Sequence, residues 1–496
     1  MLNSSSLQSK KFDGLTTFTT WVYGVGHVMN DLCAACWFNY LLYFLANVQK
    51  ISSGVAGAVM LSGQLGDGIA TPIVGLYSDK FNTRFGRRKP WYMIGTVIVP
   101  ICFFFIWEDC YPCMVMSGNS RAAMQVFWYC FFAATFNLGW AAIQISHMSL
   151  IPSLTPIKEK KTKLITLRTA FTYISNIAVL LIALALFKLI SDPEIQFHVL
   201  SIIVLCIGLS INILFIFTIK EVELSQIASE SYRDLGKMLN ESQNTEMNGS
   251  NEQENNGSVI EEMNWKDWLK KSQTYWIGGV YMLARLANNV ITAMLPFYLT
   301  AVLSMGGVST VDEASKKTPW ELALIPLCLY IGSAGMSLML DRFEPTFTRR
   351  GISRKLIFGA GVCFVLLGVV PMVFLTHETR YYMVPVSVVL GLGLSIMLNC
   401  AMGFISAFVG EHGTSGAFVW GTMSLFDKFS SGMALFFVTN LGSLDSTGYI
   451  RATVAGIPLA AAAIGGVVCL FVKNVREYTN EETERMSIHL EEKASS

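Results

Sequence analysis

Residues 75–90 read GLYSDKFNTRFGRRKP, and residues 338–355 read LMLDRFEPTFTRRGISRK. Each stretch follows a long apolar run, places an aspartate (Asp79, Asp341) at its edge and continues into an arginine-rich turn. The two stretches stand at the same point of two successive halves, a layout typical of membrane carriers built as parallel repeats. We therefore expect a gate that pairs these acids with the basic turns, and the alternative is an anchor for the cytosolic face. The gate residues are Asp79, Arg87, Arg88, Asp341 and Arg350.

The composition is that of a membrane protein. Of the 496 residues, 52% are apolar and only 14% are charged, against about 25% charged in soluble domains. The mean hydropathy is +0.47. A net charge of +1 leaves no basic stripe for a phosphate backbone, so nucleic acid is excluded as a partner. The first apolar run follows a polar start and lacks a small-residue cleavage site, which predicts a retained span.

About twelve apolar segments are long enough to cross the roughly 30 Å of hydrocarbon as helices. They predict an all-α integral membrane fold of two six-helix bundles, an N-terminal one over 1–219 and a C-terminal one over 273–472. Residues 220–272 should form a largely disordered linker, and 473–496 a tail. The segments are 17–46, 54–77, 91–107, 122–150, 168–190, 198–219, 273–303, 319–340, 356–375, 383–409, 417–441 and 451–472.

The basic residues set the expected orientation. They concentrate in loops 78–90, 152–167 and 341–355, which lie on one side if the span count is right. The positive-inside rule then predicts that both termini and the linker are cytosolic. The linker contains Tyr232-Arg-Asp-Leu235, a pattern that clathrin adaptors read, although such tetrapeptides also occur by chance. We expect a monomer in the lipid bilayer.

Charges at membrane depth cost at least about 2.5–3.5 kcal/mol each on insertion scales, so they mark candidate sites. In the first half, a histidine and a carboxylate stand four residues apart on one helical face, a spacing suited to proton binding. A buried aspartate follows in the second span among glycines, and two polar residues share a face of the fourth. Polar pairs that only join helices are the alternative. The candidates are His27, Asn30, Asp31, Asp67, Gln144 and His147.

The second half offers cations. Arg285 in the seventh span could grip a substrate carboxylate with two parallel bonds, with Asn289 on the same face. Asp427 and Lys428 are neighbours in the eleventh span and therefore point about 100° apart, so one could face a cavity while the other pairs elsewhere. Acids in one half and cations in the other would suit a zwitterion such as an amino acid. We expect no cofactor and no metal.

Cys110-Tyr-Pro-Cys113 is the one cysteine pair in a short loop outside the spans. It predicts either a disulfide or two unrelated thiols. A zinc site is not expected, because no second ligand pair accompanies it.

The residues Asp67, Pro72, Gly75, Asp79, Gly86-Arg87 and Pro90-Trp91 follow a known signature. They resemble the glycoside-pentoside-hexuronide:cation symporters of the major facilitator superfamily. In that family two carboxylates form a sodium site, but Thr71 stands here where the second belongs. His27 likewise occupies a position where many of these symporters carry an aspartate. The resemblance therefore implies the superfamily fold, and its departures favour protons, or no cation, over sodium.

Four longer segments are similar to a eukaryotic branch of the superfamily: YGVGHVMNDLCAACWFNYLL, GWAAIQISHMSLIP, YMLARLANNV and SGAFVWGTMSLFDK. The likeness covers nearly all spans and leaves out the linker and tail. It implies import of cysteine, or a related small amino acid, into lysosomes and related organelles such as melanosomes, where it influences pigment.

Two other functions remain open. The first is a sugar or glycoside:cation symporter, which the short signature favours and Thr71 and His27 disfavour. The second is a non-transporting organellar scaffold or trafficking factor. The plasma membrane is the alternative location. An enzyme is not expected, because the sequence contains neither a Ser-His-Asp nor an H-E-x-x-H constellation.

Overall fold

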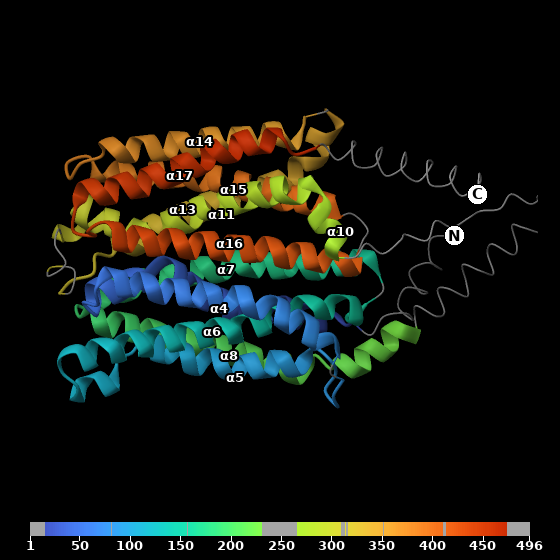
Figure 1. Cartoon of the computed structure of the whole chain (residues 1–496). Coiled ribbons are helices and arrows are strands. Elements are labelled where there is room, and N and C mark those ends of the chain that lie inside the picture. The colour runs from blue at the N-terminus through green and yellow to red at the C-terminus, as the bar shows by residue number, and fades with distance from the viewer. Residues whose placement is uncertain are drawn as a thin grey trace, which may run out of the picture. The chain divides into compact units, whose positions relative to one another are not determined.

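The computed structural model describes residues 15–80, 82–155, 157–230, 265–308, 313, 316–350, 352–409 and 413–473. Helices make up the regular structure of this part of the chain, apart from one isolated bridge between Thr83 and Gly86 (Figure 1). Ahead of the linker lie α2 (Thr17–Val25), α3 (Val28–Cys36), the π-helices η1 (Trp37–Leu41) and η2 (Phe44–Val48), α4 (Ser53–Lys80), α5 (Lys89–Ile106), the short η3 (Tyr111–Val115), α6 (Gly118–Leu154), α7 (Lys158–Leu189) and α8 (Pro193–Thr218). Beyond it lie α10 (Trp265–Lys270), α11 (Ser272–Phe297), the π-helix η4 (Tyr298–Val302), α13 (Glu321–Arg349), α14 (Arg354–Phe374), α15 (Met383–Val409), α16 (Gly413–Leu441) and α17 (Thr447–Leu470).

Helices cover each of the predicted spans, and their ends follow local sequence signals. Thr16, Ser353 and Ser446 accept backbone N–H bonds as N-caps of α2, α14 and α17. Pro90 stands in the first turn of α5, where its missing N–H costs nothing. The all-helical prediction is confirmed.

Eight of the described helices are long and apolar enough to cross a membrane on their own: α5, α6, α7, α8, α13, α14, α15 and α17. The other predicted spans correspond to the α2–η2 run, α4, α11 and α16. Each of these carries buried polar or charged side chains, such as Asp31, Asp67, Asn289 and Asp427. These side chains lower the apolar character of the segments that contain them.

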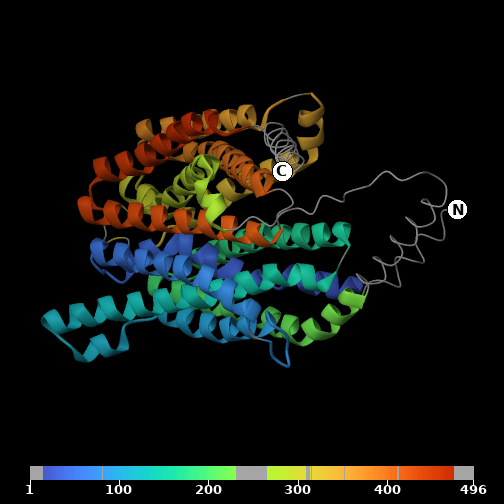
Figure 2. The ribbon, with the colours of Figure 1, turned by 45° about the vertical axis from the view of Figure 1, so that its right-hand side comes forward.

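The chain forms two compact units. The first takes the described parts of Met1–Cys36, Gly66–Val179 and Phe197–Ile260. Within it α5 packs along α6 (Figures 1 and 2). Gly95 allows the two helices to approach closely there, because a Cβ at this position would lie 2.6 Å from the carbonyl oxygen of Gly139.

The second unit takes the described parts of Trp37–Leu65, Leu180–Gln196 and Glu261–Ser496. In it α15 packs against both α13 and α14, and α11 packs against α17. The first spans of both predicted halves end in π-helical turns, η2 and η4, and rings of Tyr43 and Phe297 meet edge to face with centroids 5.6 Å apart. The division into 1–219, 220–272, 273–472 and 473–496 stays a prediction.

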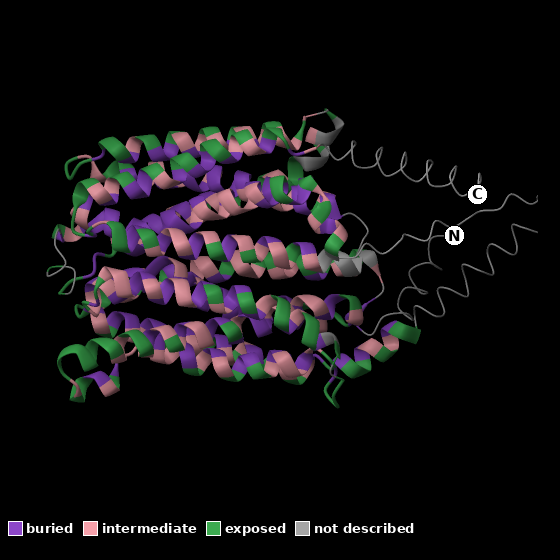
Figure 3. Cartoon of the chain, in the orientation of Figure 1, coloured by how far each residue is buried: buried purple, intermediate pink, exposed green. Residues whose placement is uncertain are grey.

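Exposed residues occur along the lengths of the helices (Figure 3), and many of them are large and apolar. Leu338, Leu367 and Val97 are each more than 60% exposed. Polar residues such as Asn30 and His147 are fully buried. This inversion of the soluble pattern is what a lipid environment requires, since hydrocarbon can cover apolar side chains and cannot satisfy polar ones.

Candidate functional site

The first span is broken at Gly26 and His27. Helix α2 ends at Val25 and α3 begins at Val28, and the turn between them frees backbone carbonyls. Gly26 is needed for packing, because a Cβ there would collide with the ring of Phe215 on α8. Broken membrane helices often build binding sites, since their freed backbone groups and side chains face a polar interior.

Side chains from three neighbouring helices satisfy the break. His147 on α6 places Nε2 2.9 Å from the carbonyl oxygen of Tyr23, and the Tyr23 hydroxyl donates to the His147 carbonyl. The Tyr92 hydroxyl on α5 lies 2.6 Å from the carbonyl oxygen of Gly26 and 2.8 Å from Oδ1 of Asn212 on α8. These bonds tie the turn that contains His27 to α5 and α6.

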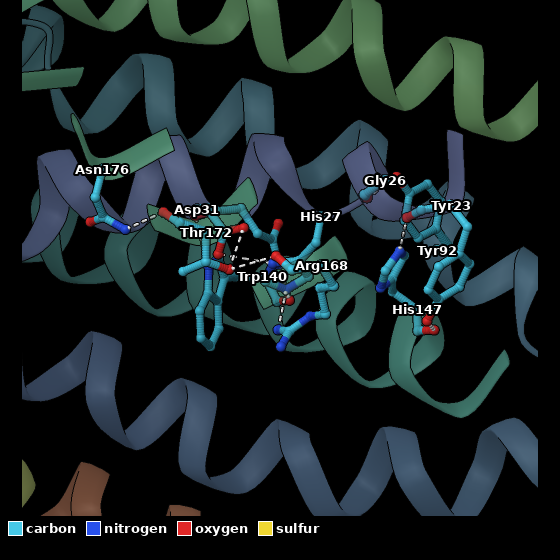
Figure 4. Close-up of polar contacts among 11 residues, drawn as sticks. Tyr23, Gly26, His27, Asp31, Tyr92, Trp140, His147, Arg168, Thr172 and Asn176 are labelled. Atoms are coloured by element: carbon cyan, nitrogen blue, oxygen red, sulfur yellow. Dashed lines mark hydrogen bonds and ion pairs between the residues drawn. The ribbon is translucent and has the colours of Figure 1, made fainter. Parts of the chain in front are cut away.

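His27 and Asp31, both buried, meet the half-buried Arg168 and Thr172 in one group, which we call the His27 cluster (Figure 4). His27 Nδ1 lies 3.0 Å from Oδ1 of Asp31, a close contact that is too bent to count as a hydrogen bond. The Thr172 hydroxyl donates to Oδ2 of Asp31 over 3.1 Å. From α7, NH2 of Arg168 lies 3.3 Å from Nε2 of His27. One carboxylate, one imidazole and one guanidinium thus meet in a small volume.

Arg168 of the His27 cluster and two polar residues of α3 and α6 have spare hydrogen-bonding capacity. Nε of Arg168, Oδ1 of Asn30 and Oε1 of Gln144 are buried atoms without a hydrogen-bond partner. Asn30 is itself held by Trp140 through two bonds, from Nδ2 to the Trp140 carbonyl and from the Trp140 indole to the Asn30 carbonyl. Gln144 shares the face of α6 that presents Trp140 and His147. Buried polar groups are nearly always paired, so these atoms are candidates to bond a water molecule or a polar ligand.

Asp67 is buried in α4, one helical turn before the threonine that departs from the symporter signature. The Thr71 hydroxyl donates to Oδ1 of Asp67 over 3.2 Å. Close approach of the neighbouring helix explains Gly66, because a Cβ there would lie 2.8 Å from the carbonyl oxygen of Ala134 on α6. Thr71 therefore supplies a donor where a second carboxylate would supply an acceptor.

In the second unit, Arg285 and Asp427 form a buried ion pair. Nε of Arg285 on α11 donates to Oδ2 of Asp427 on α16 over 2.9 Å. Asn289 and Ser431 each donate to Oδ1 of Asp427 over 3.2 Å. This carboxylate is fully supplied with donors, and the arginine that could have gripped a substrate already holds a carboxylate of its own chain.

Lys428 points elsewhere, as its position next to Asp427 on a helix requires. Its ammonium lies 5.6 Å from the centroid of the Phe38 ring. Within the described residues, no group of three or more His, Cys, Asp or Glu side chains could hold a metal ion.

The arginine-rich turn of the first half is bound by an acid that the sequence reasoning missed. Both oxygens of the buried Glu221 carboxylate accept backbone N–H bonds at the start of α5, from Arg87, Arg88 and Lys89, over 2.8–3.1 Å. Gly86 has a φ of +110°, and a Cβ there would collide with the same carboxylate. Glu221 therefore caps a helix N-terminus and fixes the turn.

The remaining predicted positions are less informative. Asp341 and Arg350 are exposed, and the side chain of Asp79 lies outside the described residues. A disulfide bond joins Cys110 and Cys113 across η3, with Cα atoms 5.2 Å apart. Tyr232 and Leu235 also lie outside the described residues.

Residues 22–472 match the family model described as MFS/sugar transport protein. The chain belongs to the major facilitator superfamily. It is 30% identical over 468 residues to major facilitator superfamily domain-containing protein 12 of Homo sapiens, covering 90% of this chain and 89% of that protein. It is 29% identical over 231 residues to an uncharacterized symporter of Synechocystis, covering 46% and 42% of the two chains. The inward open xylose transporter XylE from E. coli shares its fold, with a TM-score of 0.63 at 12% identity over 92% of this chain and 96% of that one.

This superfamily member is therefore a multi-pass membrane transporter of the symporter type, not an enzyme. Its structure brings together His27 and Asp31, as their spacing predicted, and Arg285 with Asp427, whose pairing sequence reasoning did not foresee. It also adds Arg168 to the site. Arg168 is the first residue of the predicted span 168–190, and its charge at that place was the sequence signal for it.

Proposed function

We propose that this transporter carries a small amino acid, with cysteine as the favoured substrate, into lysosomes or related organelles such as melanosomes. It works by alternating access and couples transport to protons, and both termini face the cytosol. The proposal joins the chemistry of the His27 cluster to the likeness to the eukaryotic branch described above.

The observation that carries the proposal is the pairing of opposite charges in the His27 cluster. Arg168 has a buried Nε without a partner, and Asp31 lies one contact away through His27. A free amino acid carries a carboxylate and an ammonium about two bonds apart, so it matches a guanidinium and a carboxylate held close together. A neutral sugar offers no charge to either group.

A sugar or glycoside is the second candidate, and one contact favours it. The Trp140 ring lies next to Asn30, and the amide oxygens of Asn30 and Gln144 are buried without partners. Amide groups beside an aromatic ring are suited to hydroxyl-rich ligands. The symporter signature points the same way.

Uptake into proteoliposomes that contain the purified chain tests the substrate. We expect labelled cysteine to accumulate, unlabelled cysteine to compete and sugars not to compete. Arg168→Gln should reduce uptake at least tenfold, whereas Arg121→Gln, on the exposed start of α6, should not. Competition by a sugar with none by cysteine would reverse the order of the two candidates. No uptake of either would leave the scaffold or trafficking role.

Location needs a separate test. We expect the chain, expressed with a fluorescent tag, to overlap with a lysosomal marker. Tyr232→Ala should shift it toward the plasma membrane if the tetrapeptide binds clathrin adaptors. Unchanged lysosomal location in that variant would refute the sorting role without touching the carrier proposal.

A further inference from the structure

The contact between Arg168 and His27 fixes the protonation of the imidazole. A guanidinium has only donors, so Nε2 of His27 must accept the bond from NH2 of Arg168. The ring proton therefore sits on Nδ1, next to Asp31. In this arrangement His27 is neutral, and the nitrogen that could take a second proton is occupied by an arginine.

Other groups that face His27 do not offer an equivalent proton site. On α6, Nε2 of His147 faces a carbonyl oxygen and must carry its proton, and Nδ1 is buried without a partner. The two imidazole rings are 5.7 Å apart, so two charged rings would repel each other. Tyr23 and Tyr92 bind backbone carbonyls, and Thr172 and Asp31 bind each other. Only His27, with Asp31 beside it, has a carboxylate to stabilise the charged ring.

The guanidinium of Arg168 has an edge that suits a carboxylate. Nε and NH2 lie on the same edge, and such an edge holds a carboxylate by two parallel bonds. Nε is buried and unpaired, and within the described part of the chain Arg168 forms no ion pair with an acid of its own. NH2 carries two N–H groups, so it can bond a carboxylate at this edge as well as His27. A substrate carboxylate there would draw the guanidinium toward itself and neutralise the positive charge that now faces Nε2 of His27.

We infer that substrate carboxylate and proton are coupled through Arg168, which caps Nε2 of His27 before substrate binds and releases it when a carboxylate binds. The freed nitrogen then takes one proton, and the charged ring pairs with Asp31. Substrate binding therefore raises the affinity of His27 for a proton. Protonation of His27 raises the affinity for substrate by the same factor, because binding linkage is reciprocal. This inference rests on the proposed carriage of an amino acid and adds its coupling mechanism.

Calorimetry on the purified full chain tests the coupling, and it needs binding only. Cysteine is titrated between pH 5.5 and 7.0 in buffers of different ionisation enthalpy, which reports the protons taken up per ligand. We expect about one proton per cysteine and affinity that strengthens up to about tenfold per pH unit of acidification. Cysteinamide lacks the carboxylate and should bind weakly with no proton uptake.

The variants locate the proton. His27→Gln should bind cysteine with affinity independent of pH and without proton uptake, whereas His377→Gln, in a loop of the second unit, should behave as the unchanged chain. Proton uptake that persists in His27→Gln, or that accompanies cysteinamide, would overturn the inference. If His27→Gln does not fold, the comparison of cysteine with cysteinamide on the unchanged chain decides alone. Failure to bind cysteine at all would reject the proposed substrate, whereas binding without proton uptake would reject only this coupling.

Discussion

Asp427→Asn should destabilise the second unit, because it leaves the guanidinium of Arg285 buried without a counter-charge. The change keeps the size of the side chain and removes one negative charge and one good acceptor. In the unchanged chain, the neutral donors Asn289 and Ser431 bond to the carboxylate. In the variant they would face an amide, which has one acceptor oxygen and one donor nitrogen. The variant therefore isolates the charge from the packing.

The magnitude follows from the geometry. At the 2.9 Å separation of Nε and Oδ2, Coulomb attraction at an effective dielectric constant of about 20 is about 6 kcal/mol. Part of this offsets the desolvation of both ions, and breaking a buried pair costs about 3–5 kcal/mol in practice. The side chain of Arg285 is 21% exposed, so we expect the lower end, about 3 kcal/mol. That corresponds to a fall in Tm of about 6–12 °C on the scaling for medium-sized domains.

Thermal unfolding of the purified chain in detergent measures the effect. Arg285→Gln and the double variant complete a cycle, and the double variant should recover about 2 kcal/mol of the summed losses, because both charges are then gone. Asp445→Asn, in an exposed position before α17, is the matched control. Equal Tm values for Asp427→Asn and Asp445→Asn would refute the reasoning.

Three smaller changes test other features. Gly26→Ala should lower the free energy of unfolding by about 1–3 kcal/mol through overpacking at the helix break. At Gly359 an added Cβ meets nothing within 4 Å, so Gly359→Ala should change the free energy of unfolding by about 0.5 kcal/mol at most. Glu221→Gln should cost about 1–2 kcal/mol by weakening the charged cap of α5 and raise proteolysis of the 82–88 turn. Glu223→Gln, on the exposed face, should do neither, and equal cleavage in both would contradict the capping role. Thr71→Asp should place a second carboxylate next to Asp67, one helical turn earlier. Sodium should then raise the Tm of this variant and not the Tm of the unchanged chain. A rise in both Tm values would show that one carboxylate suffices for sodium.

Local spacing predicted what lies along one helix. His27 and Asp31 are four residues apart, and the structure holds them in contact. The helices themselves were predictable for the same reason, because length and apolar character are properties of a single segment. The family match confirms the fold that these segments indicated.

The spacing of residues along the sequence could not predict which side chains of distant segments are in contact. Arg168 meets His27 across 141 residues of sequence, and Glu221 binds the backbone of Arg87 across 134. A single sequence contains no record of which helix faces are neighbours. It therefore did not show that Arg168, at the start of a predicted span, contacts His27. The same limit applied to Arg285. The sequence allowed one of Asp427 and Lys428 to pair with another helix, but it did not show that Asp427 is the counter-ion of Arg285.

The pairing of α11 with α16 has a consequence for how the chain is made. Arg285 needs a partner 142 residues later in the sequence, so α11 leaves the ribosome long before the helix that neutralises it. Until α16 is made, the charge of Arg285 raises the free energy of α11 in lipid. We therefore expect α11 to stay at the insertion machinery or beside another protein until then. Membrane quality control would then meet this unpaired arginine in any chain truncated before α16. The ion pair thus also marks a chain that has been synthesised as far as α16.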